Sequence, residues 1–238
     1  MRLDAVLFDV GGVVLLPDRQ KVTTALAMAD IEHDLTKIDA AHYRGVHAGD
    51  GVELADERQS YAKLARATYV SSLGIAPRDL PQAARIIDEL FLKPSSEVWT
   101  QIVPGASELL KELAAAELSV AIVSNADGTV ETSLSSLGIC QVGPGSATAV
   151  KAIVDSTIVG ISKPDPRIFT YTLTLLGVRA ENAIVIGDSE WNDIQAASRI
   201  GILGIHVDPL ELCRRREQHR HVQSFSGLGP MLLCLGHP

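Results

Sequence analysis

The chain has little of several features that mark large protein classes. Only 4% of its 238 residues are aromatic, and its three cysteines, Cys140, Cys213 and Cys234, are scattered. An odd cysteine count without a CxxC pair argues against a disulfide framework and favours a reducing, cytoplasmic location. No apolar run approaches the roughly 20 residues of a membrane span. The N-terminal run is too short and too interrupted to predict a signal peptide.

Positive charge is scarce as well. Lys and Arg number 21 against 29 Asp and Glu, which gives a formal net charge of −8. An acidic chain has no electrostatic reason to bind nucleic acid or an anionic membrane. Hydrophobic residues make up 46%, so a chain of this length can bury a substantial core. We expect a globular protein with no nucleic-acid and no membrane partner; an oligomer is compatible with the sequence but unsupported by it.

Five short apolar runs predict buried strands. Their hydrophobic residues are continuous rather than alternating, which is typical of a parallel sheet covered on both faces. Helical patterns lie between the later runs: one at Gly105–Glu117, one from Asp165-Pro166 to Gly177, and one that ends at Gly201. Strands that alternate with helices predict a doubly wound, Rossmann-like α/β fold. The five runs are Ala5–Phe8, Val120–Val123, Ala152–Val154, Ala183–Ile186 and Ile202–Val207.

The stretch from about residue 17 to residue 99 has a different pattern. It carries no strong strand signal and predicts several helices, broken at Gly49–Gly51, Gly74 and Pro77. The simplest arrangement is an all-helical cap, residues 17–99, inserted into an α/β core made of residues 1–16 and 100–238. The expected cap helices are Gln20–Ala29, Thr36–His47, Val52–Leu73 and Leu80–Phe91.

Polar side chains follow the predicted strands at the points where the strands end. An open parallel sheet binds its ligands beyond the carboxyl ends of its strands. Several strand ends therefore deliver carboxylate, hydroxyl and ammonium groups to one edge of the sheet. They are Asp9 after the first run, Ser124 and Asn125 after the second, Lys163 in SKPDP, and Asp188 and Asp193 after the fourth.

Carboxylates gathered at one edge repel one another unless a cation lies between them. A hard ion that prefers oxygen ligands, such as Mg²⁺, fits such a site together with the phosphate oxygens of a substrate. Lys163 and the Ser124 hydroxyl would then contact the anionic part of the substrate, and Asp9 could attack it to form a covalent intermediate. This arrangement is typical of phosphoryl transfer through an aspartyl-phosphate.

Four motifs resemble, in order, those of the haloacid dehalogenase superfamily of hydrolases: FDVGGVV, VSNADGT, SKPDP and IGDSEWND. Members of that superfamily carry a helical cap where residues 17–99 stand in this chain. The resemblance implies that Asp9 is the nucleophile and a metal ligand, and that the Gly11 carbonyl is a further ligand. It also implies phosphate contacts from Ser124 and Lys163, and Mg²⁺ held directly or through water by Asp188 and Asp193.

We therefore predict a Mg²⁺-dependent hydrolase of small phosphorylated metabolites. Gly11, Gly12 and Asn125 are candidate substrate contacts. The cap is expected to close over the site, exclude water and select the substrate. The identity of that substrate depends on cap side chains that the sequence does not place.

One position departs from the family pattern. Phosphatases of this superfamily usually carry a second Asp two residues after the nucleophile, which protonates the leaving oxygen and later activates water. Gly11 has no side chain for either task, although general acid–base catalysis typically contributes roughly 10²–10⁴-fold. Asp18 could return to the site as a substitute, but N-capping of the first cap helix is the simpler interpretation. For His42 and His47 we favour surface or structural roles over proton donation.

Gly11 leaves alternatives to a phosphatase open. Haloacid dehalogenases and the phosphonate-cleaving members of the superfamily both lack the second Asp. The phosphonate-cleaving members retain metal and form a Schiff base on a cap lysine, for which Lys21, Lys37 and Lys63 are the candidates here. Retention of GDSEWND favours a metal-dependent reaction. The remaining alternative is a catalytically weak protein that binds phosphate and metal.

Three further segments receive structural interpretations. GPGS (Gly143–Ser146) lacks the ending of a Walker loop and is interpreted as a loop before the third strand. Cys213 with His219 and His221 matches no standard zinc spacing, so CRRREQHRH is interpreted as a basic, solvated helix or loop. The apolar FSGLGPMLLCLG is expected to dock on the core.

Overall fold

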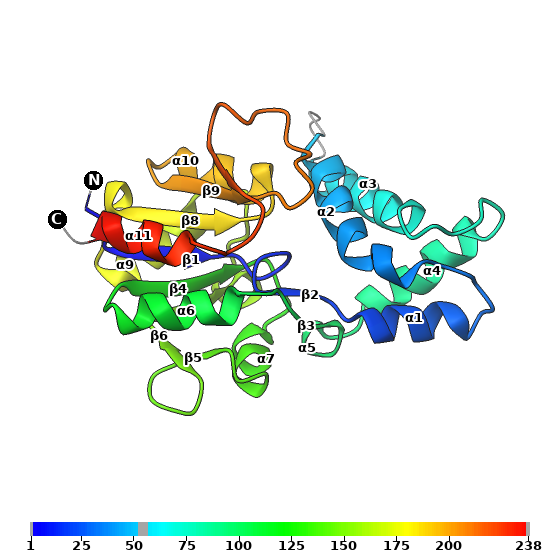
Figure 1. Ribbon diagram of the computed structural model, residues 1–238, viewed down its shortest axis with the longest axis horizontal. Coiled ribbons are helices and arrows are strands. Elements are labelled where there is room, and N and C mark those ends of the chain that lie inside the picture. Colours follow the sequence, from blue (N-terminus) through cyan, green and yellow to red (C-terminus); the bar gives the residue numbers. More distant parts are fainter. Residues whose placement is uncertain (1, 52–56, 237–238) are drawn as a thin grey trace.

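The computed structural model describes residues 2–51 and 57–236, which form an α/β unit with a helical unit beside it (Figure 1). Six parallel strands make the central sheet, and five of them match the predicted runs. The predicted doubly wound α/β fold is thereby confirmed. The strand order across the sheet is β10 (Arg220–Val222), β9 (Leu203–Val207), β8 (Ala183–Gly187), β1 (Ala5–Phe8), β4 (Ser119–Ser124) and β7 (Ala152–Asp155).

Helices cover both faces of the sheet, as the continuous apolar runs predict. Successive strand residues point to opposite faces, so Val6 and Phe8 of β1 pack on one face while Ala5 and Leu7 pack on the other. Complete burial of a Leu, Ile or Phe side chain contributes about 1.5–3 kcal/mol. The first face is covered by α6 (Ala106–Ala115), α7 (Val130–Ser136) and α11 (Leu228–Gly236), and the second by α9 (Arg167–Leu176) and α10 (Ala196–Ser198).

The C-terminal apolar segment docks on the core as expected, because Phe225, Leu228 and Leu232 are buried in the cluster of the first face. The basic segment before it contains the short strand β10, so its interpretation as a solvated helix or loop is wrong at that point. Its residues 214–218 are exposed, whereas Cys213 is buried.

The helical insertion after β1 has a core of its own. Val22, Leu26, Ile38, Leu73 and Ile87 are fully buried in it. The expected Val52–Leu73 helix is described from Glu57 onward, and residues 52–56 lie outside the described part. The helices are α1 (Arg19–Ala27), η1 (Leu35–Lys37), α2 (Ile38–Asp50), α3 (Glu57–Ser71), α4 (Leu80–Phe91) and α5 (Ser95–Val98).

Two short antiparallel strands join the helical insertion to the core, and the sequence patterns did not predict them. β2 (Leu15–Pro17) leads the chain out and β3 (Trp99–Ile102) leads it back (Figure 1). Strands of three and four residues are too short to show a period of two. They fall at the expected limits of the cap, whose boundaries at residues 17 and 99 remain predictions.

The remaining elements lie away from the carboxyl edge or connect the core strands. The GPGS segment forms the loop between β5 (Cys140–Val142) and β6 (Thr148–Val150), as interpreted. The others are α8 (Ser156–Val159), η2 (Ala180–Asn182) and the π-helical turn η3 (Glu190–Gln195). Among the described residues no helix combines the length and apolar character needed to cross a membrane.

Candidate functional site

Asp9 is held at the carboxyl end of β1 by a tight backbone loop. Its N–H donates to the carbonyl of Ile186 in the neighbouring β8, at 2.9 Å. The carbonyl of Val10 accepts from the N–H groups of Val14 and Leu15, both at 2.8 Å. The loop therefore turns the chain sharply back while Asp9 stays in register with the sheet.

The two glycines of this loop have different roles. Gly12 has φ +67°, and a Cβ there would lie 2.0 Å from Oδ2 of Asp188, so only glycine fits. Gly12 does not line the cavity described below, which gives its predicted substrate contact no support. Gly11 does line the cavity, and a Cβ there would meet nothing closer than the Trp99 ring at 3.5 Å. Position 11 thus has room for a side chain.

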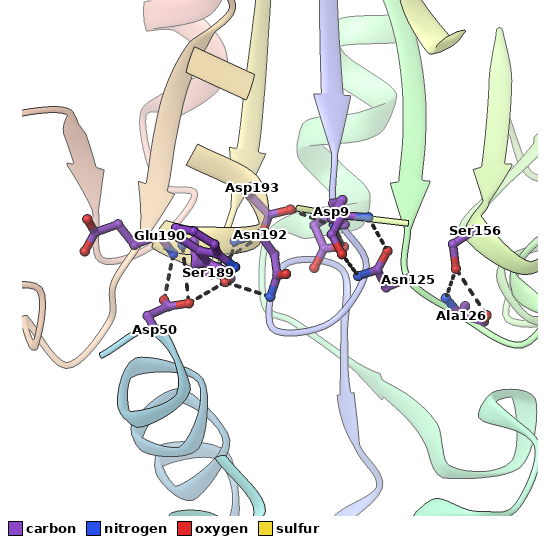
Figure 2. Close-up of polar contacts among 11 residues, drawn as sticks. Asp9, Asp50, Asn125, Ala126, Ser156, Ser189, Glu190, Asn192 and Asp193 are labelled. Atoms are coloured by element: carbon purple, nitrogen blue, oxygen red, sulfur yellow. Dashed lines mark hydrogen bonds and ion pairs between the residues drawn. The ribbon is translucent and has the colours of Figure 1, made fainter. Parts of the chain in front are cut away.

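Three carboxylates and one ammonium group meet beyond the strand ends. Asp9, Asp188 and Asp193 each place an oxygen within 4.8 Å of the others. The Lys163 ammonium donates to Oδ1 of Asp193 at 2.7 Å and also to Oδ1 of Asp9. Figure 2 shows Asp9, at the end of β1, facing Asp193, which lies in η3 after the neighbouring strand β8. Gly187 permits this approach, because a Cβ there would lie 2.3 Å from Cβ of Asp193.

Burial and mutual repulsion perturb these groups. Burial raises the pKa of Asp9 to about 6, although the Lys163 ammonium lowers it. Burial also raises the pKa of Asp193. Burial alone would lower the pKa of Lys163, but the two carboxylates raise it above its ordinary value, so the side chain stays charged. Repulsion between the carboxylates adds to burial, since Asp193 raises the pKa of Asp9 and Asp188 raises that of Asp193.

The donor set of this cluster fits Mg²⁺. Three carboxylates against one ammonium leave an excess of two negative charges when all are ionised, which a divalent cation would balance. All three side chains offer hard oxygen atoms, the ligands that Mg²⁺ prefers. The structure thus brings together the side chains predicted as metal ligands, with the Gly11 backbone beside them.

Ser124 and Asn125 lie at the end of β4 and line the same cavity. Ser124 is buried, with 5% of its surface exposed. The Asn125 amide donates to the Lys163 carbonyl at 2.9 Å and accepts from the Lys163 N–H at 2.8 Å. Asn125 therefore positions Lys163 through its backbone, a role that the sequence did not indicate.

The loop after β8 is fixed by a residue of the insertion. Oδ1 of Asp50, the last residue of α2, accepts from the Ser189 hydroxyl at 2.6 Å, and Oδ2 accepts from the Glu190 N–H at 2.7 Å (Figure 2). Burial raises the pKa of Asp50 to about 8. Asp50 lies in a Gly-Asp-Gly break, so sequence reasoning took it for part of a turn and missed this contact.

The insertion also places a histidine in the site. Nε2 of His42 lies 2.7 Å from Oδ2 of Asp188, and the ring packs edge-on against Tyr43 and Trp99. An ionised carboxylate only accepts hydrogen bonds, so Nε2 of His42 carries a proton in this contact. A surface location is therefore wrong for His42, which is 9% exposed and lines the cavity, whereas the choice between a structural role and proton donation stays a prediction.

Core and insertion together enclose a cavity of about 430 Å³. Its floor is the carboxylate cluster with Lys163, and its walls include an apolar and aromatic face from the insertion. A volume of this size is typical of a small-molecule site. The insertion contributes His42, Tyr61, Arg66, Tyr69, Phe91 and Trp99 to the lining.

Other candidates of the insertion do not reach the cavity. Asp18 caps α1, accepting from the Lys21 N–H at 3.1 Å and from the Thr100 hydroxyl at 2.7 Å. Burial opposes ionisation of Asp18, but these hydrogen bonds lower its pKa below the ordinary value. The carboxylate is therefore ionised and bonded to groups outside the cavity. His47 and the lysines at positions 21, 37 and 63 are likewise outside the lining among the described residues.

Comparison with known proteins agrees with this site. Residues 3–201 match the sequence model of the haloacid dehalogenase-like hydrolases. The phosphoserine phosphatase of Thermus thermophilus is 31% identical over 128 residues, 54% of this chain and 48% of that protein. The phosphoglycolate phosphatase of Rhodospirillum rubrum is 30% identical over 202 residues, 83% of this chain and 76% of that protein. The chain thus spans between about half and three quarters of the length of these curated relatives.

Solved structures share the fold along almost the whole chain. The hydrolase YfnB from Bacillus subtilis, bound to magnesium, has a TM-score of 0.59 and 20% identity, and the match covers 98% of this chain and 99% of that one. A dehalogenase with an intermediate complex has a TM-score of 0.62 and 19% identity, with 97% of each chain covered. Identities this low show the fold alone. The family follows instead from the sequence model, which matches residues 3–201 and so covers more than half of the chain. This chain belongs to the haloacid dehalogenase-like hydrolases.

Proposed function

We propose that the chain is a Mg²⁺-dependent phosphatase that acts on small phosphorylated metabolites through an aspartyl-phosphate on Asp9. The observation that carries the proposal is the position of Asp9 on the floor of the cavity, between the Lys163 ammonium and two further carboxylates. Such a floor attracts a cation and, with it, a phosphoryl group. The phosphatases among the relatives support the same class of substrate.

In the first step an oxygen of Asp9 attacks phosphorus. A bond forms between that oxygen and phosphorus, and the bond from phosphorus to the leaving alcohol breaks. Water then attacks the acyl phosphate, which releases inorganic phosphate and restores the carboxylate. Lys163 orients Asp9 and neutralises phosphoryl charge, and the Ser124 hydroxyl donates a hydrogen bond to a phosphoryl oxygen.

Asp9, Asp188 and Asp193 with the Gly11 carbonyl would hold the Mg²⁺ ion. When bound, it supplies charge neutralisation at the phosphoryl oxygens. The residues of this chain then keep the nucleophile in line, because Asn125 fixes the backbone of Lys163 and the Val10 carbonyl fixes the loop after Asp9.

We further propose that His42 supplies the proton that position 11 cannot supply. Its Nε2–H lies in the cavity beside Asp188, and the ring is held by the edge contacts with Tyr43 and Trp99. Imidazole is the side chain whose charge ordinarily changes near neutral pH, which suits a general acid. With both ring nitrogens protonated, the imidazolium gives its Nε2 proton to the departing alcohol oxygen, and the neutral imidazole that remains can later accept one from the attacking water.

The test compares two leaving groups with and without Mg²⁺. Phosphate release is measured from an aryl phosphate, whose leaving group departs with little help, and from an alkyl phosphate, which needs a proton. We expect turnover of both with Mg²⁺ and a loss of roughly 10⁴-fold or more in Asp9→Asn. Asp79→Asn, a change on the partly exposed Asp79 at the start of α4, is the matched control and should retain the activity.

Other outcomes point to the alternatives. Halide release from haloacids, with no phosphate release, would contradict the phosphatase. Phosphonate cleavage is disfavoured because no cap lysine among the described residues lines the cavity. Binding of Mg²⁺ and phosphate without turnover would identify a catalytically weak binding protein. Turnover of the aryl phosphate alone would contradict the role of His42 but not that of Asp9.

A further inference from the structure

A second cluster of metal-ligating side chains lies on the sheet beside β8, outside the cavity. It consists of three imidazoles and one thiol, from His206, Cys213, His219 and His221. One ligand atom of each lies within 4.8 Å of the ligand atoms of the others. None of the four lines the cavity of the carboxylate site, so the two clusters are separate sites.

The fold brings these residues together from three places in the sequence. Register between β9 and β10 pairs His206 directly with His221. His219 lies directly before β10, and its ring stacks on that of His221 with centroids 4.5 Å apart. Cys213 approaches from the loop between the two strands, and both Cys213 and His206 are buried.

Two of the distances between ligand atoms match those of a tetrahedral metal site. Zinc lies about 2.0–2.1 Å from imidazole nitrogen and about 2.3 Å from thiolate sulfur, so tetrahedral ligands lie about 3.3 Å apart for two nitrogens and about 3.6 Å for nitrogen and sulfur. Here Nδ1 of His206 lies 3.3 Å from Nε2 of His219. Sγ of Cys213 lies 3.7 Å from the same Nε2.

The ring of His221 is buried without a hydrogen bond to any described residue. Its side chain is 9% exposed, and neither ring nitrogen has a hydrogen-bond partner. A buried polar group left unpaired costs about 1–3 kcal/mol. Burial lowers the pKa of His219 to about 4 and that of His221 below its ordinary value. Neutral imidazoles carry the lone pairs that a metal requires.

Hydrogen bonding around the cluster also suits metal ligation. Nε2 of His206 lies 3.0 Å from the Asp188 carbonyl, which can only accept, so Nε2 donates and Nδ1 is left with its lone pair toward the cluster. Metal-binding histidines usually donate their second N–H to a carbonyl or carboxylate in this way. The Asp208 carboxylate lies 3.6 Å from Nδ1 of His221, and Glu190 and Arg215 face the cluster from its rim.

We propose that His206, Cys213, His219 and His221 form a structural Zn²⁺ site. Imidazole and thiolate are ligands that select Zn²⁺ over Mg²⁺, and four protein ligands close the coordination sphere, as in structural rather than catalytic zinc sites. The ion would displace the thiol proton of Cys213 and join the segment after β9 to the sheet. Through the bond between His206 and the Asp188 carbonyl, it would also steady the loop that carries Asp188.

The test uses the full chain, stripped with a chelator and supplied with excess Mg²⁺ to fill the carboxylate site. Titration with Co²⁺ should give a thiolate-to-metal charge-transfer band that saturates near one equivalent and disappears when Zn²⁺ is added. The carboxylate site contains no sulfur, so it cannot produce this band. Zinc binding should also raise the thermal unfolding temperature, since the metal binds only the folded arrangement.

Three variants give the test its specificity. Cys213→Ser should abolish the band, and Cys234→Ser, at the exposed cysteine of α11, should retain it. His219→Asn should weaken Zn²⁺ binding by more than the roughly 10–100-fold that loss of an outer partner costs. If circular dichroism shows that Cys213→Ser is unfolded, the affinity of His219→Asn for Zn²⁺ tests the site in its place. A wild-type chain without the band, a band that persists in Cys213→Ser, or an unchanged Zn²⁺ affinity in His219→Asn overturns the proposal.

Discussion

Asp188 connects two clusters of opposite chemistry. Its carboxylate belongs to the oxygen-rich floor of the cavity with Asp9 and Asp193, and its backbone carbonyl accepts from His206 of the imidazole and thiol cluster. The first cluster lies at the ends of strands β1 and β8, whereas the second lies across β9 and β10. The first cluster offers the carboxylate oxygens that suit the Mg²⁺ ion we propose there, and the second offers the imidazole and thiolate groups that suit the proposed Zn²⁺ ion.

The two clusters also differ in how far the sequence reveals them. The carboxylates follow predicted strands directly, so the general rule for parallel sheets was enough to bring Asp9, Asp188 and Lys163 together. The second cluster depends on β10, which the patterns did not predict, and on the register that pairs His206 with His221. Charged side chains at strand ends can therefore be predicted from the residues around each strand. A set of ligands that is completed by the pairing of two strands cannot.

The largest expected effect sharpens the role of charge in the first cluster. Lys163→Met should lower kcat for phosphate release by about 10³-fold, as loss of one preorganised charge at the transition state does. Lys151→Met, at an exposed lysine before β7, should leave kcat unchanged. Steady-state kinetics with saturating Mg²⁺ measures both variants. A loss of less than about tenfold in Lys163→Met would show that the ammonium does not act on the reacting group.

The next largest effect is a gain of phosphatase activity when position 11 receives an acid. Gly11→Asp should raise the alkyl phosphatase rate by about 10²-fold, the lower end of the contribution of a general acid. The backbone tolerates the change, since a Cβ at position 11 has its nearest neighbour 3.5 Å away. Gly11→Asn adds the same volume without a titrating group and serves as the control. An equal gain in both variants would assign the effect to packing against Trp99.

A smaller loss tests the proton source. His42→Asn should lower turnover of the alkyl phosphate by about tenfold and leave the aryl phosphate nearly unchanged, because only the alkyl group needs protonation. In the Gly11→Asp background the same change should cost less, since an acid is then already present. The control is His33→Asn, at a histidine of the insertion that contacts Thr23. An equal loss with both substrates would make His42 a positioning residue for Asp188.

The smallest effect is on the pH dependence of stability, through Asp50 and its hydrogen bonds to the loop after β8. Burial raises the pKa of Asp50 to about 8, so the folded chain binds a proton there that the unfolded chain releases near its ordinary pKa. The stabilisation that comes from this proton on Asp50 is therefore fully present below the ordinary pKa of an Asp, and it is lost as pH rises toward 8. In chelator, wild type should lose about 1 kcal/mol more than Asp50→Asn between pH 6 and pH 7, measured by urea unfolding. Equal pH slopes in the two proteins would contradict this.

The sequence predicted the core more fully than the insertion. Four of the motif side chains, Asp9, Lys163, Asp188 and Asp193, lie together as expected. His42 and Asp50 were not placed in the site, because helical periodicity shows which face is apolar but not which strand end that face meets. Gly12 was predicted as a substrate contact, but its close approach to Asp188 was not, because that approach depends on a loop that brings two distant segments together; a Cβ at Gly12 would lie 2.0 Å from Oδ2 of Asp188.

The central claim is that Asp9 carries the phosphoryl group during turnover. The direct measurement is to quench the protein with borohydride while it turns over an aryl phosphate with Mg²⁺, and then to sequence the N-terminal peptide by mass spectrometry. Borohydride reduces an acyl phosphate to an alcohol, so we expect homoserine in place of Asp9, present only with substrate. Turnover with unmodified Asp9, or reduction at another carboxylate, would contradict it.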